Sequence, residues 1–403
     1  MSFLTSLETP CLLLDADRLE RNCSRMRERL QAHGVSLRQH VKTAKCEQVA
    51  RLAAGGGLGP ITVSTLKEAD RFAEAGWRDI LYAVGIVPGK LAHVRRLRSQ
   101  GVDLKVVLDS IEAARALREA AIAQAASGGS GPGDPAAPAR PDGTDARIPV
   151  LIEIDCDGHR AGVRPDDVDT LVAIGRLLES PATTLAGVMT HAGASYDCRS
   201  LEAIADMAER ERAAIVQAAD ALCAAGLPCP IRSVGSTPTA LMARRLDGIT
   251  EVRAGVYQFF DLVMAGLGVC GVDDIALSVL ASVIGHQPER GWTIVDAGWM
   301  AMSRDRGTSA QPVDQGYGLA CTVDGRPLGD LVMAQANQEH GILGARGAIG
   351  ASGTAAPSAP RLPVGTLLRI LPNHACATGA QHDRYHLVRD GRIEAVWPRF
   401  SGW

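Results

Sequence analysis

The sequence has 403 residues, 46% of them hydrophobic, so it is long enough to form two domains with sizeable cores. Its formal net charge at pH 7 is −3, and Lys and Arg are scattered along the chain, which argues against a nucleic-acid partner. Ten cysteines occur without a C-x-x-C pair, which favours reduced thiols over a disulfide framework.

The N-terminal residues contain neither a basic segment nor a continuous apolar segment, so no secretory signal is predicted. The most apolar stretch, residues 262–272, is bounded by Asp261 and Asp273 and is too short to cross a bilayer. We therefore expect a soluble, cytoplasmic protein without a membrane partner.

Short β-rich runs alternate with amphipathic helical patterns between residues 37 and 253. Eight strands are predicted, at Leu37–Thr43, Pro60–Ser64, Asp79–Val84, Leu104–Asp109, Ile148–Asp155, Thr184–His191, Pro230–Gly235 and Ile249–Arg253. Eight β/α repeats favour an α/β fold with a closed TIM-like (β/α)8 barrel, although an open doubly wound sheet is the alternative. In either fold, active groups belong at the carboxyl ends of the strands.

The remainder of the chain predicts a second, mostly β domain. Residues 126–147 are rich in Gly, Pro, Ala and Ser, and we expect a flexible surface insertion there. After residue 265 the helical alternation stops, and β-rich runs separated by turns follow. These runs are Leu277–His286, Trp292–Asp296, Leu319–Val323, Asp330–Gln338, Thr366–Leu371, Tyr385–Arg389 and Arg392–Trp397. A strand at Cys11–Asp15 can join them, so the predicted division is a barrel at 16–264 and a β domain formed by 1–15 plus 265–403.

Lys42 stands where the first predicted barrel strand ends. A lysine that is partly dehydrated there can lose its proton near neutral pH and form an imine with an aldehyde cofactor. The alternative is an ordinary solvated surface lysine.

Two segments that follow the seventh and eighth barrel strands are candidates for binding a phosphate. In Ser-Val-Gly-Ser-Thr-Pro-Thr (233–239), small residues offer amides and hydroxyls at a predicted helix N-terminus. In Arg-Ala-Gly-Val-Tyr (253–257), a glycine allows close approach of the main chain and a tyrosine can donate a hydrogen bond. The candidate ligands are Gly235, Ser236, Thr237, Gly255 and Tyr257. An ordinary Gly/Ser turn is the alternative for either segment.

The ends of the fifth and sixth barrel strands carry Arg160 and His191. Arg160 could bind a cofactor's phenolic oxygen, and His191 could orient or stack on its ring. Alternatively, Arg160 only pairs with Asp155 or Asp157, and His191 is a buried core histidine with satisfied hydrogen bonds.

Near the C-terminus, His374 and Cys376 stand two residues apart. In an extended segment they would face the same side and could bind one ion through imidazole nitrogen and thiolate, a pair that suits Zn²⁺ or another divalent metal. Two protein ligands imply an open, catalytic type of site. The alternative is a buried cysteine beside an unrelated histidine.

Taken together, these segments resemble the D-serine dehydratase and D-threonine aldolase family, whose barrel is shared with the alanine racemase N-terminal domain. The resemblance covers nearly the whole chain and rests on these runs: Thr-Pro-Cys-Leu-Leu-Leu-Asp (9–15), His-Val-Lys-Thr-Ala-Lys (40–45), Glu-Ile-Asp (153–155), Arg-Ala-Gly-Val (160–163), Gly-Ser-Thr-Pro-Thr (235–239), Arg-Ala-Gly-Val-Tyr (253–257), Val-Asp-Ala-Gly-Trp (295–299), Glu-His-Gly (339–341) and Pro-Asn-His-Ala-Cys-Ala-Thr (372–378). It implies a fold-type III pyridoxal-phosphate enzyme, usually a homodimer, with Lys42 as the Schiff-base lysine. It also implies that Arg253 lies near the pyridine nitrogen, although members of this family vary at that position.

Within this family, aldolases carry an H-x-D metal pair, whereas dehydratases carry a segment that resembles the His-Ala-Cys of this chain. The resemblance thus implies a dehydratase acting on a D-β-hydroxy-amino acid, such as D-serine or D-threo-3-hydroxyaspartate, and giving a 2-oxo acid and ammonia. In this hypothesis Lys42 removes the Cα proton, and Zn²⁺ held by His374 and Cys376 stabilises the departing hydroxyl. The alternatives are retro-aldol cleavage to glycine and an aldehyde, a racemase, and a pyridoxal-phosphate carrier protein without catalysis.

Overall fold

The computed structural model describes residues 3–126, 146–348 and 360–403. The chain divides into two compact units. We call the first, formed by Met1–Met26, Thr43–Val49 and Val256–Ser401, the β unit, and the second, formed by Arg27–Lys42, Ala50–Gly255 and Gly402–Trp403, the barrel unit. Most of the insertion predicted at 126–147 lies outside the described residues.

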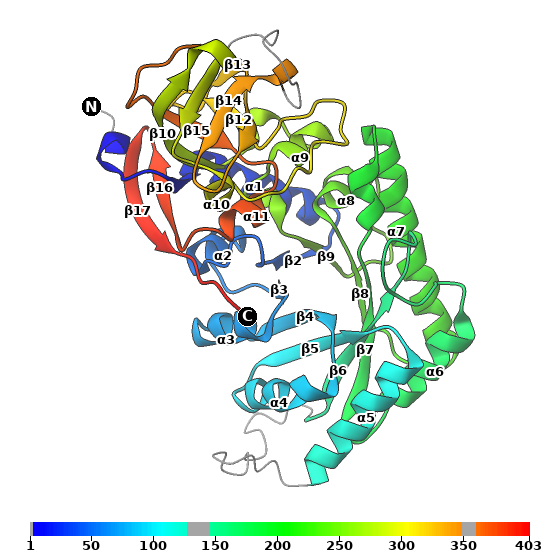
Figure 1. The fold of residues 1–403 in the computed structure, drawn as a ribbon. Coiled ribbons are helices and arrows are strands. Elements are labelled where there is room, and N and C mark those ends of the chain that lie inside the picture. Colours follow the sequence, from blue (N-terminus) through cyan, green and yellow to red (C-terminus); the bar gives the residue numbers. More distant parts are fainter. Residues whose placement is uncertain (1–2, 127–145, 349–359) are drawn as a thin grey trace. The chain divides into compact units, whose positions relative to one another are not determined.

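The barrel unit contains a closed sheet of parallel strands, β2 to β9, each paired with the next (Figure 1). The barrel closes where β9 pairs with β2, which places Arg253 in register with Arg38. In the described residues its eight strands are β2 Ser36–His40, β3 Ile61–Val63, β4 Asp79–Gly85, β5 Asp103–Leu108, β6 Ile148–Ile154, β7 Thr183–Thr190, β8 Ile231–Val234 and β9 Glu251–Ala254. The predicted (β/α)8 barrel is confirmed, and the open-sheet alternative is wrong.

Helices follow the barrel strands along the chain, and several begin at capping residues. Thr65 and Ser200 accept hydrogen bonds from backbone N–H groups in the first turns of α3 and α7, which satisfies donors that have no partner within the helix. The helices of this part of the chain are α1 Ala16–Ala32, α2 Glu47–Ala53, α3 Leu66–Glu74, α4 Leu91–Ser99, α5 Ile111–Ala126, α6 Val168–Leu178, α7 Leu201–Ala224 and α8 Thr237–Met242. Of these, α1 and α2 contribute residues to both units.

Side chains from the barrel strands form two kinds of core. Strands β4 to β7 contribute a buried apolar cluster, which consists of Leu81, Val107, Leu151, Ala186 and Met189. Strands β2, β8 and β9 instead contribute buried polar side chains that bind one another, among them Arg38, Ser233, Glu251 and Arg253. Because a buried charge must be paired, the polar side requires fixed side-chain positions.

The β unit contains a sheet in which the first strand of the chain lies among the last ones. Among the described residues the order is β11-β14-β13-β12-β15-β10-β1-β16-β17, with β1 antiparallel to β10 and parallel to β16. The strands are β1 Cys11–Asp15, β10 Leu277–Gln287, β11 Trp292–Val295, β12 Leu319–Cys321, β13 Pro327–Ala336, β14 Gly341–Ala345, β15 Leu367–Leu371, β16 Arg384–Arg389 and β17 Arg392–Pro398. The sequence predicted all of them except β14, and β1 joins this sheet as expected.

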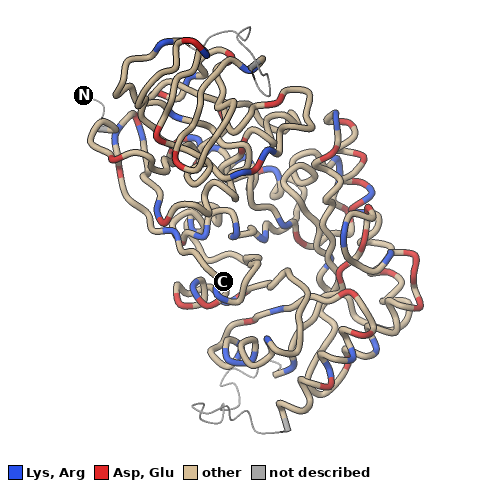
Figure 2. Tube along the Cα trace, viewed as in Figure 1, with Lys and Arg blue, Asp and Glu red and all other residues tan. Residues whose placement is uncertain are grey.

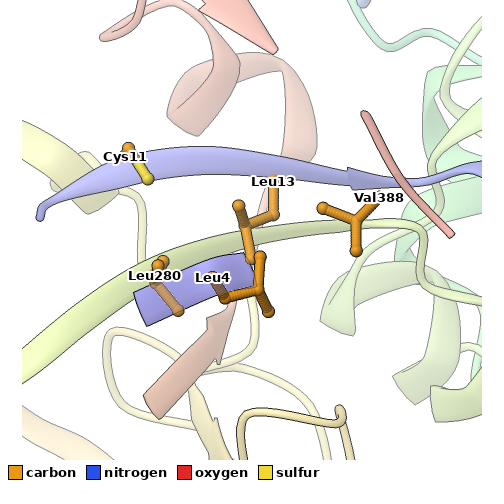
Figure 3. Close-up of a cluster of buried hydrophobic side chains, with 5 residues drawn as sticks. All are labelled: Leu4, Cys11, Leu13, Leu280 and Val388. Atoms are coloured by element: carbon orange, nitrogen blue, oxygen red, sulfur yellow. The ribbon is translucent and has the colours of Figure 1, made fainter. Parts of the chain in front are cut away.

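A buried apolar cluster packs N-terminal residues against strands β10 and β16 of the β unit (Figure 3). Cys11 and Leu13, two residues apart on β1, pack with Leu4, with Leu280 of β10 and with Val388 of β16. The period-two spacing on β1 presents both side chains to the same face. Within the described residues, this unit also contains several 3-10 helices and three short α-helices, α9 Leu262–Gly266, α10 Trp299–Met302 and α11 Ala375–Gly379.

Charged residues of both signs are interspersed along the chain, as the tube in Figure 2 shows. None of the helices in the described part of the chain combines the length and the apolar character that crossing a membrane requires.

Candidate active site

Lys42 lies in a turn two residues after the end of β2. Its backbone N–H is 3.5 Å from Nδ1 of His40, and its side chain is exposed. The position after the strand end agrees with the sequence, but the side chain is exposed rather than partly dehydrated. The pKa of His40 is lowered well below its usual value, mainly because its ring is buried and then because of the positive charge of Lys42.

His191 directly follows β7, and its ring is held by the next loop of the barrel. Nδ1 lies 2.9 Å from the carbonyl oxygen of Gly235. Burial lowers the pKa of His191 to about 4, and the positive charges of Arg160, Lys42 and Arg253 contribute to this decrease. The hydrogen bond to Gly235 acts in the opposite direction. The imidazole is therefore neutral at pH 7. A neutral ring that binds a carbonyl through Nδ1 carries its proton there, so Nε2 is a hydrogen-bond acceptor.

Arg160 is exposed and forms an ion pair of 3.5 Å with Glu153 of β6. The alternative pairing with Asp155 or Asp157 is not the one found. Asp155 accepts backbone N–H bonds from residues 157 and 158, and Asp157 accepts them from residues 159 and 194. Both carboxylates thus shape the loop after β6, and Arg160 remains near enough to His191 to affect its pKa.

The loop after β8 requires a glycine. Gly235 has φ +141°, and a Cβ there would lie 2.0 Å from the carbonyl oxygen of Arg253. Its N–H donates to Glu211. Ser236 caps α8 through a reciprocal pair of bonds with Thr239.

These bonds differ from the sequence expectation for a phosphate site. The amides of Gly235 and Ser236 donate to protein acceptors, and the Ser236 hydroxyl lies 3.0 Å from that of Ser195. The capping box thus uses groups that the sequence assigned to a phosphate. Thr237, the first residue of α8, is buried.

Arg253 is buried and bound on two sides. Its guanidinium donates to the Ser233 hydroxyl at 2.7 Å and to the carbonyl oxygen of Thr190. Ser233 in turn donates to Glu251 at 2.7 Å, and Arg38 donates to the other oxygen of Glu251 at 2.8 Å. Burial lowers the pKa of Arg253, while neighbouring glutamates oppose that change. The result is a positive charge fixed between β7, β8 and β9.

Gly255 and Tyr257 lie where the chain leaves the barrel. Gly255 is the last residue of that segment of the barrel unit, whereas Tyr257 belongs to the β unit, in a short 3-10 helix at Val256–Gln258. Tyr257 is 0% exposed, so its hydroxyl is enclosed by protein.

In the β unit, His374 and Cys376 stand at the start of α11. His374 is the extended residue before the helix, and Cys376 lies in its first turn. The prediction that both occupy one extended segment is wrong. The reason is a distant cap: Asp261 accepts the N–H of Ala375 through one oxygen and that of Met264 through the other, each at 2.9 Å. This buried carboxylate starts two helices at once.

The two side chains nevertheless interact. His374 hydrogen-bonds to the Cys376 side chain, and its Nδ1 lies 2.6 Å from Oδ2 of Asp305. Burial disfavours the charged imidazole, but the bonds to Asp305 and Cys376 outweigh it and raise the pKa of His374 to about 11. On the other side, the Thr43 hydroxyl lies 3.2 Å from the Cys376 sulfur. Thr43 is the residue that follows Lys42.

This donor set fits a divalent metal. A histidine that binds a carboxylate through Nδ1 can offer Nε2 to a metal, as metal-bound histidines usually do, and thiolate and imidazole suit Zn²⁺. The His374 side chain is 43% exposed, so an ion can reach it. Within the described ranges no group of three or more His, Cys, Asp or Glu residues is arranged to hold a metal. Solvent or substrate would therefore complete the coordination.

Three acidic residues that organise these loops were missed by sequence reasoning: Glu211, Asp261 and Asp305. The signal for Glu211 was present, because it falls on the apolar stripe of α7 with Ile204, Ala208 and Ile215. Asp261 follows Phe259 and Phe260, both fully buried, which is an unusual setting for a carboxylate.

Comparisons with known proteins identify the fold family. The family described as alanine racemase, N-terminal domain, matches residues 14–262, and a putative serine dehydratase domain matches residues 276–388. The chain belongs to the alanine racemase N-terminal domain family. This is the family that the sequence motifs indicated, and its members are fold-type III pyridoxal-phosphate enzymes.

Three members of this wider group illustrate the similarity. D-threo-3-hydroxyaspartate dehydratase of Delftia sp. (strain HT23) is 54% identical over 99% of each chain, and its solved structure covers 100% of both chains with a TM-score of 0.90 and 52% identity. D-serine dehydratase of Dictyostelium discoideum is 28% identical, covering 96% of this chain and 95% of the other. A 3-hydroxy-D-aspartate aldolase of Paracoccus denitrificans is also 28% identical, over 98% and 92%.

Two further structures are of variants of a D-threo-3-hydroxyaspartate dehydratase, each with a TM-score of 0.90 to this chain. In one a histidine is replaced by alanine, and in the other, described as the metal-free form, a cysteine is replaced by alanine. The two replaced positions are two residues apart, which is the spacing of His374 and Cys376.

Proposed function

We propose that this protein is a pyridoxal-phosphate- and zinc-dependent dehydratase, an ammonia-lyase that acts on a D-β-hydroxy-amino acid such as D-serine or D-threo-3-hydroxyaspartate. The products are a 2-oxo acid and ammonia: pyruvate from D-serine and oxaloacetate from the hydroxyaspartate. The observation that carries the proposal is the 54% identity to the Delftia dehydratase over 99% of both chains.

In this proposal Lys42 holds pyridoxal phosphate through its side-chain amine and later accepts the Cα proton of the substrate on Nζ. Pyridoxal phosphate, when bound, supplies an electron sink that makes that proton acidic. The exposed side chain of Lys42 in the turn after β2 supports this assignment, since a cofactor and a substrate must both reach it. The other proposed cofactor ligands are Arg160, His191, Gly235, Ser236, Thr237, Arg253, Gly255 and Tyr257.

His191 and Arg253 have distinct tasks in this proposal. His191 is neutral and offers Nε2 as an acceptor, so it can orient a ring beside it without adding charge. Arg253 keeps a fixed positive charge, because Ser233 and the Thr190 carbonyl hold its guanidinium. A fixed donor needs no reorganisation during the reaction.

His374 and Cys376 would hold the metal, which we propose to be zinc. When bound, the metal would supply a Lewis acid for the departing hydroxyl, an effect worth several kcal/mol. Support comes from the Asp305–His374–Cys376 arrangement and from the shared spacing with the histidine and cysteine replaced in the two dehydratase variants. The Thr43–Cys376 contact links the metal pair to the residue after Lys42.

Retro-aldol cleavage to glycine and an aldehyde is the second candidate, because an aldolase is among the relatives. Its lower identity, and the cysteine rather than aspartate in the H-x-C pair, favour elimination. A carrier that binds pyridoxal phosphate without catalysis is disfavoured by the second domain.

We also propose that the barrel domain spans 16–264, that 1–15 plus 265–403 carries the metal site, and that the enzyme is a homodimer. Light scattering of the purified protein can test the oligomeric state.

Product analysis tests the proposal. The protein, loaded with pyridoxal phosphate and Zn²⁺, is incubated separately with D-serine, D-threo-3-hydroxyaspartate and their L-enantiomers. Ammonia and a 2-oxo acid in equal amounts from the D-substrates are expected. Glycine and an aldehyde would establish the aldolase instead, and cofactor binding without any product would establish the carrier.

A further inference from the structure

Glu211 is a buried carboxylate on the long helix α7. Glu211 is only 2% exposed. It lies on the buried face of α7, where the neighbouring positions carry the apolar side chains of Ala208 and Ile215. A charged residue on a buried helix face is destabilising unless it is paired, so its contacts indicate what it does.

One oxygen of this carboxylate, Oε1, joins two loops of the barrel. It accepts the N–H of Ala192 at 3.1 Å and the N–H of Gly235 at 2.9 Å. Ala192 is the residue after His191, in the loop that follows β7. Gly235 lies in the loop that follows β8, and its carbonyl oxygen accepts the hydrogen bond from Nδ1 of His191. The carboxylate therefore binds the main chain on both sides of this imidazole.

The same carboxylate reaches the start of α8. The Thr239 side chain hydrogen-bonds to Glu211 and also takes part in the capping box with Ser236. Burial raises the pKa of Glu211, while the bond to Thr239, the Gly235 N–H and the positive charge of Arg253 oppose that rise. The carboxyl group is thus compensated by Thr239 and by two residues of the candidate cofactor site, Gly235 and Arg253.

Two other bonds hold the loop after β7, but they involve neither His191 nor Ala192. The Ser195 and Ser236 hydroxyls are 3.0 Å apart, and Asp157 accepts the N–H of Ala194 at 2.9 Å. Both act farther along the loop after β7. Glu211 binds the N–H of the residue next to the imidazole and the N–H of Gly235, whose carbonyl oxygen accepts the hydrogen bond from the ring.

We propose that Glu211 is a positioning residue of the cofactor site: it fixes the orientation and tautomer of His191 and the course of the Gly235–Thr237 main chain, without touching substrate. This inference rests on the proposed function for the identity of the cofactor. Without the carboxylate, two buried N–H groups lose their acceptor, and each must find water or draw its loop away. Either change moves the Gly235 carbonyl and releases the His191 ring.

Two variants and a matched control test this role. Glu211→Ala removes the acceptor, whereas Glu211→Gln retains an amide oxygen that can accept both N–H bonds. Glu209→Ala is the control, because Glu209 lies on the same helix but accepts hydrogen bonds from the side chains of Arg212 and Arg245. Each apoprotein is titrated with pyridoxal phosphate, and the visible imine absorbance gives Kd. Steady-state rates at saturating cofactor give kcat and KM.

For Glu211→Ala we expect Kd for pyridoxal phosphate to rise at least tenfold and kcat to fall at least tenfold, with KM within twofold of wild type. Glu211→Gln should restore both to within threefold, and Glu209→Ala should match wild type. A merely structural carboxylate would lower the melting temperature of Glu211→Ala without changing Kd or kcat. That outcome overturns the proposal.

Hydrogen exchange supplies a readout that does not depend on the cofactor or on activity. In Glu211→Ala, peptides covering 189–195 and 233–239 should exchange at least tenfold faster than in wild type, while peptides from the β unit keep their rates. Wild-type exchange in both peptides overturns the role of Glu211 even if the enzyme proves to be a dehydratase. Conversely, failure of wild-type protein to bind pyridoxal phosphate overturns the proposed function and leaves the exchange result to stand alone. If Glu211→Ala does not fold, Glu211→Gln decides. Its amide oxygen can accept both N–H bonds, so a tenfold loss of affinity for pyridoxal phosphate in Glu211→Gln would contradict the proposal.

Discussion

The two histidines at the candidate centres, His191 in the barrel unit and His374 in the β unit, have opposite charge preferences. His191 binds a neutral carbonyl and lies near cations, and its pKa falls to about 4. His374 binds a carboxylate and a thiol, and its pKa rises to about 11. One ring is kept neutral at pH 7, whereas the other keeps its proton and would have to release it to bind a metal ion. Identical side chains thus prefer different charge states because of their partners.

Replacing Lys42 should produce the largest effect on the barrel centre. In Lys42→Ala we expect the visible imine absorbance to vanish and kcat to fall by at least about 10³-fold, since the variant loses both the amine that binds the cofactor and the base. Absorbance spectra and initial rates check this. Lys45→Ala, three residues along the same turn region, is the control and should retain the absorbance; an imine that survives in Lys42→Ala but is lost in Lys45→Ala would reverse the assignment.

Removing the metal should separate the two centres. Treatment with a chelator, or the change Cys376→Ser, should lower kcat by at least about 100-fold, because a Lewis acid worth several kcal/mol is lost. The imine absorbance should persist, since Lys42, the residue proposed to form the imine, belongs to the barrel unit. Metal content by mass spectrometry and restoration of activity by added Zn²⁺ complete the measurement. Full activity in metal-free protein would refute the role of this pair.

Asp305 should matter to metal affinity more than to the cofactor. In Asp305→Asn, the loss of a negative partner for Nδ1 weakens the imidazole as a ligand, and we expect metal affinity to fall about tenfold. Competition with a chromophoric chelator measures it. Asp330→Asn is the matched control, because its carboxylate pairs with Arg346 in the same unit and is 74% exposed. Equal affinities in both variants would count against the orienting role.

The neutral state of His191 predicts a smaller effect, on stability. The folded pKa is about 4 and the unfolded value is about 6.5, so between these values the unfolded chain binds more protons and acidification destabilises the fold. Between pH 7 and pH 5 this costs on the order of 1 to 2 kcal/mol. Urea unfolding of apoprotein should show that His191→Gln loses less stability over this interval than wild type. An equal loss would mean that His191 is not held neutral.

The sequence predicted the barrel well because its signals are local. Strands β3 to β7 are short, mostly apolar runs between turn residues, and all eight predicted barrel strands are present within the described residues. Strand β14, Gly341–Ala345, was missed because its sequence, Gly-Ile-Leu-Gly-Ala, contains two glycines and a single β-branched residue. It is a strand because β11 and β13 supply partners on both sides.

The sequence predicted which residues are candidates for the two sites, but not how their side chains and main chain are arranged. His374 and Cys376 were expected on a strand, yet Asp261, 114 positions earlier in the chain, caps α11 there. The amides and hydroxyls after β8 were expected to bind a phosphate, yet Glu211, Ser195 and Thr239 already bind several of them. Such partners are distant in sequence, and no local pattern reveals them.

The place of β1 in the sheet has a consequence for biosynthesis. Its antiparallel partner β10 begins at Leu277, about 260 residues after β1 ends at Asp15, and its parallel partner β16 begins later still, at Arg384. At ordinary ribosomal speeds of about 5–20 residues per second, the first strand waits roughly 13 to 50 seconds for a neighbour. The intervening barrel emerges complete during that delay. The described barrel strands are therefore all synthesised before β1 has a partner strand in its own sheet.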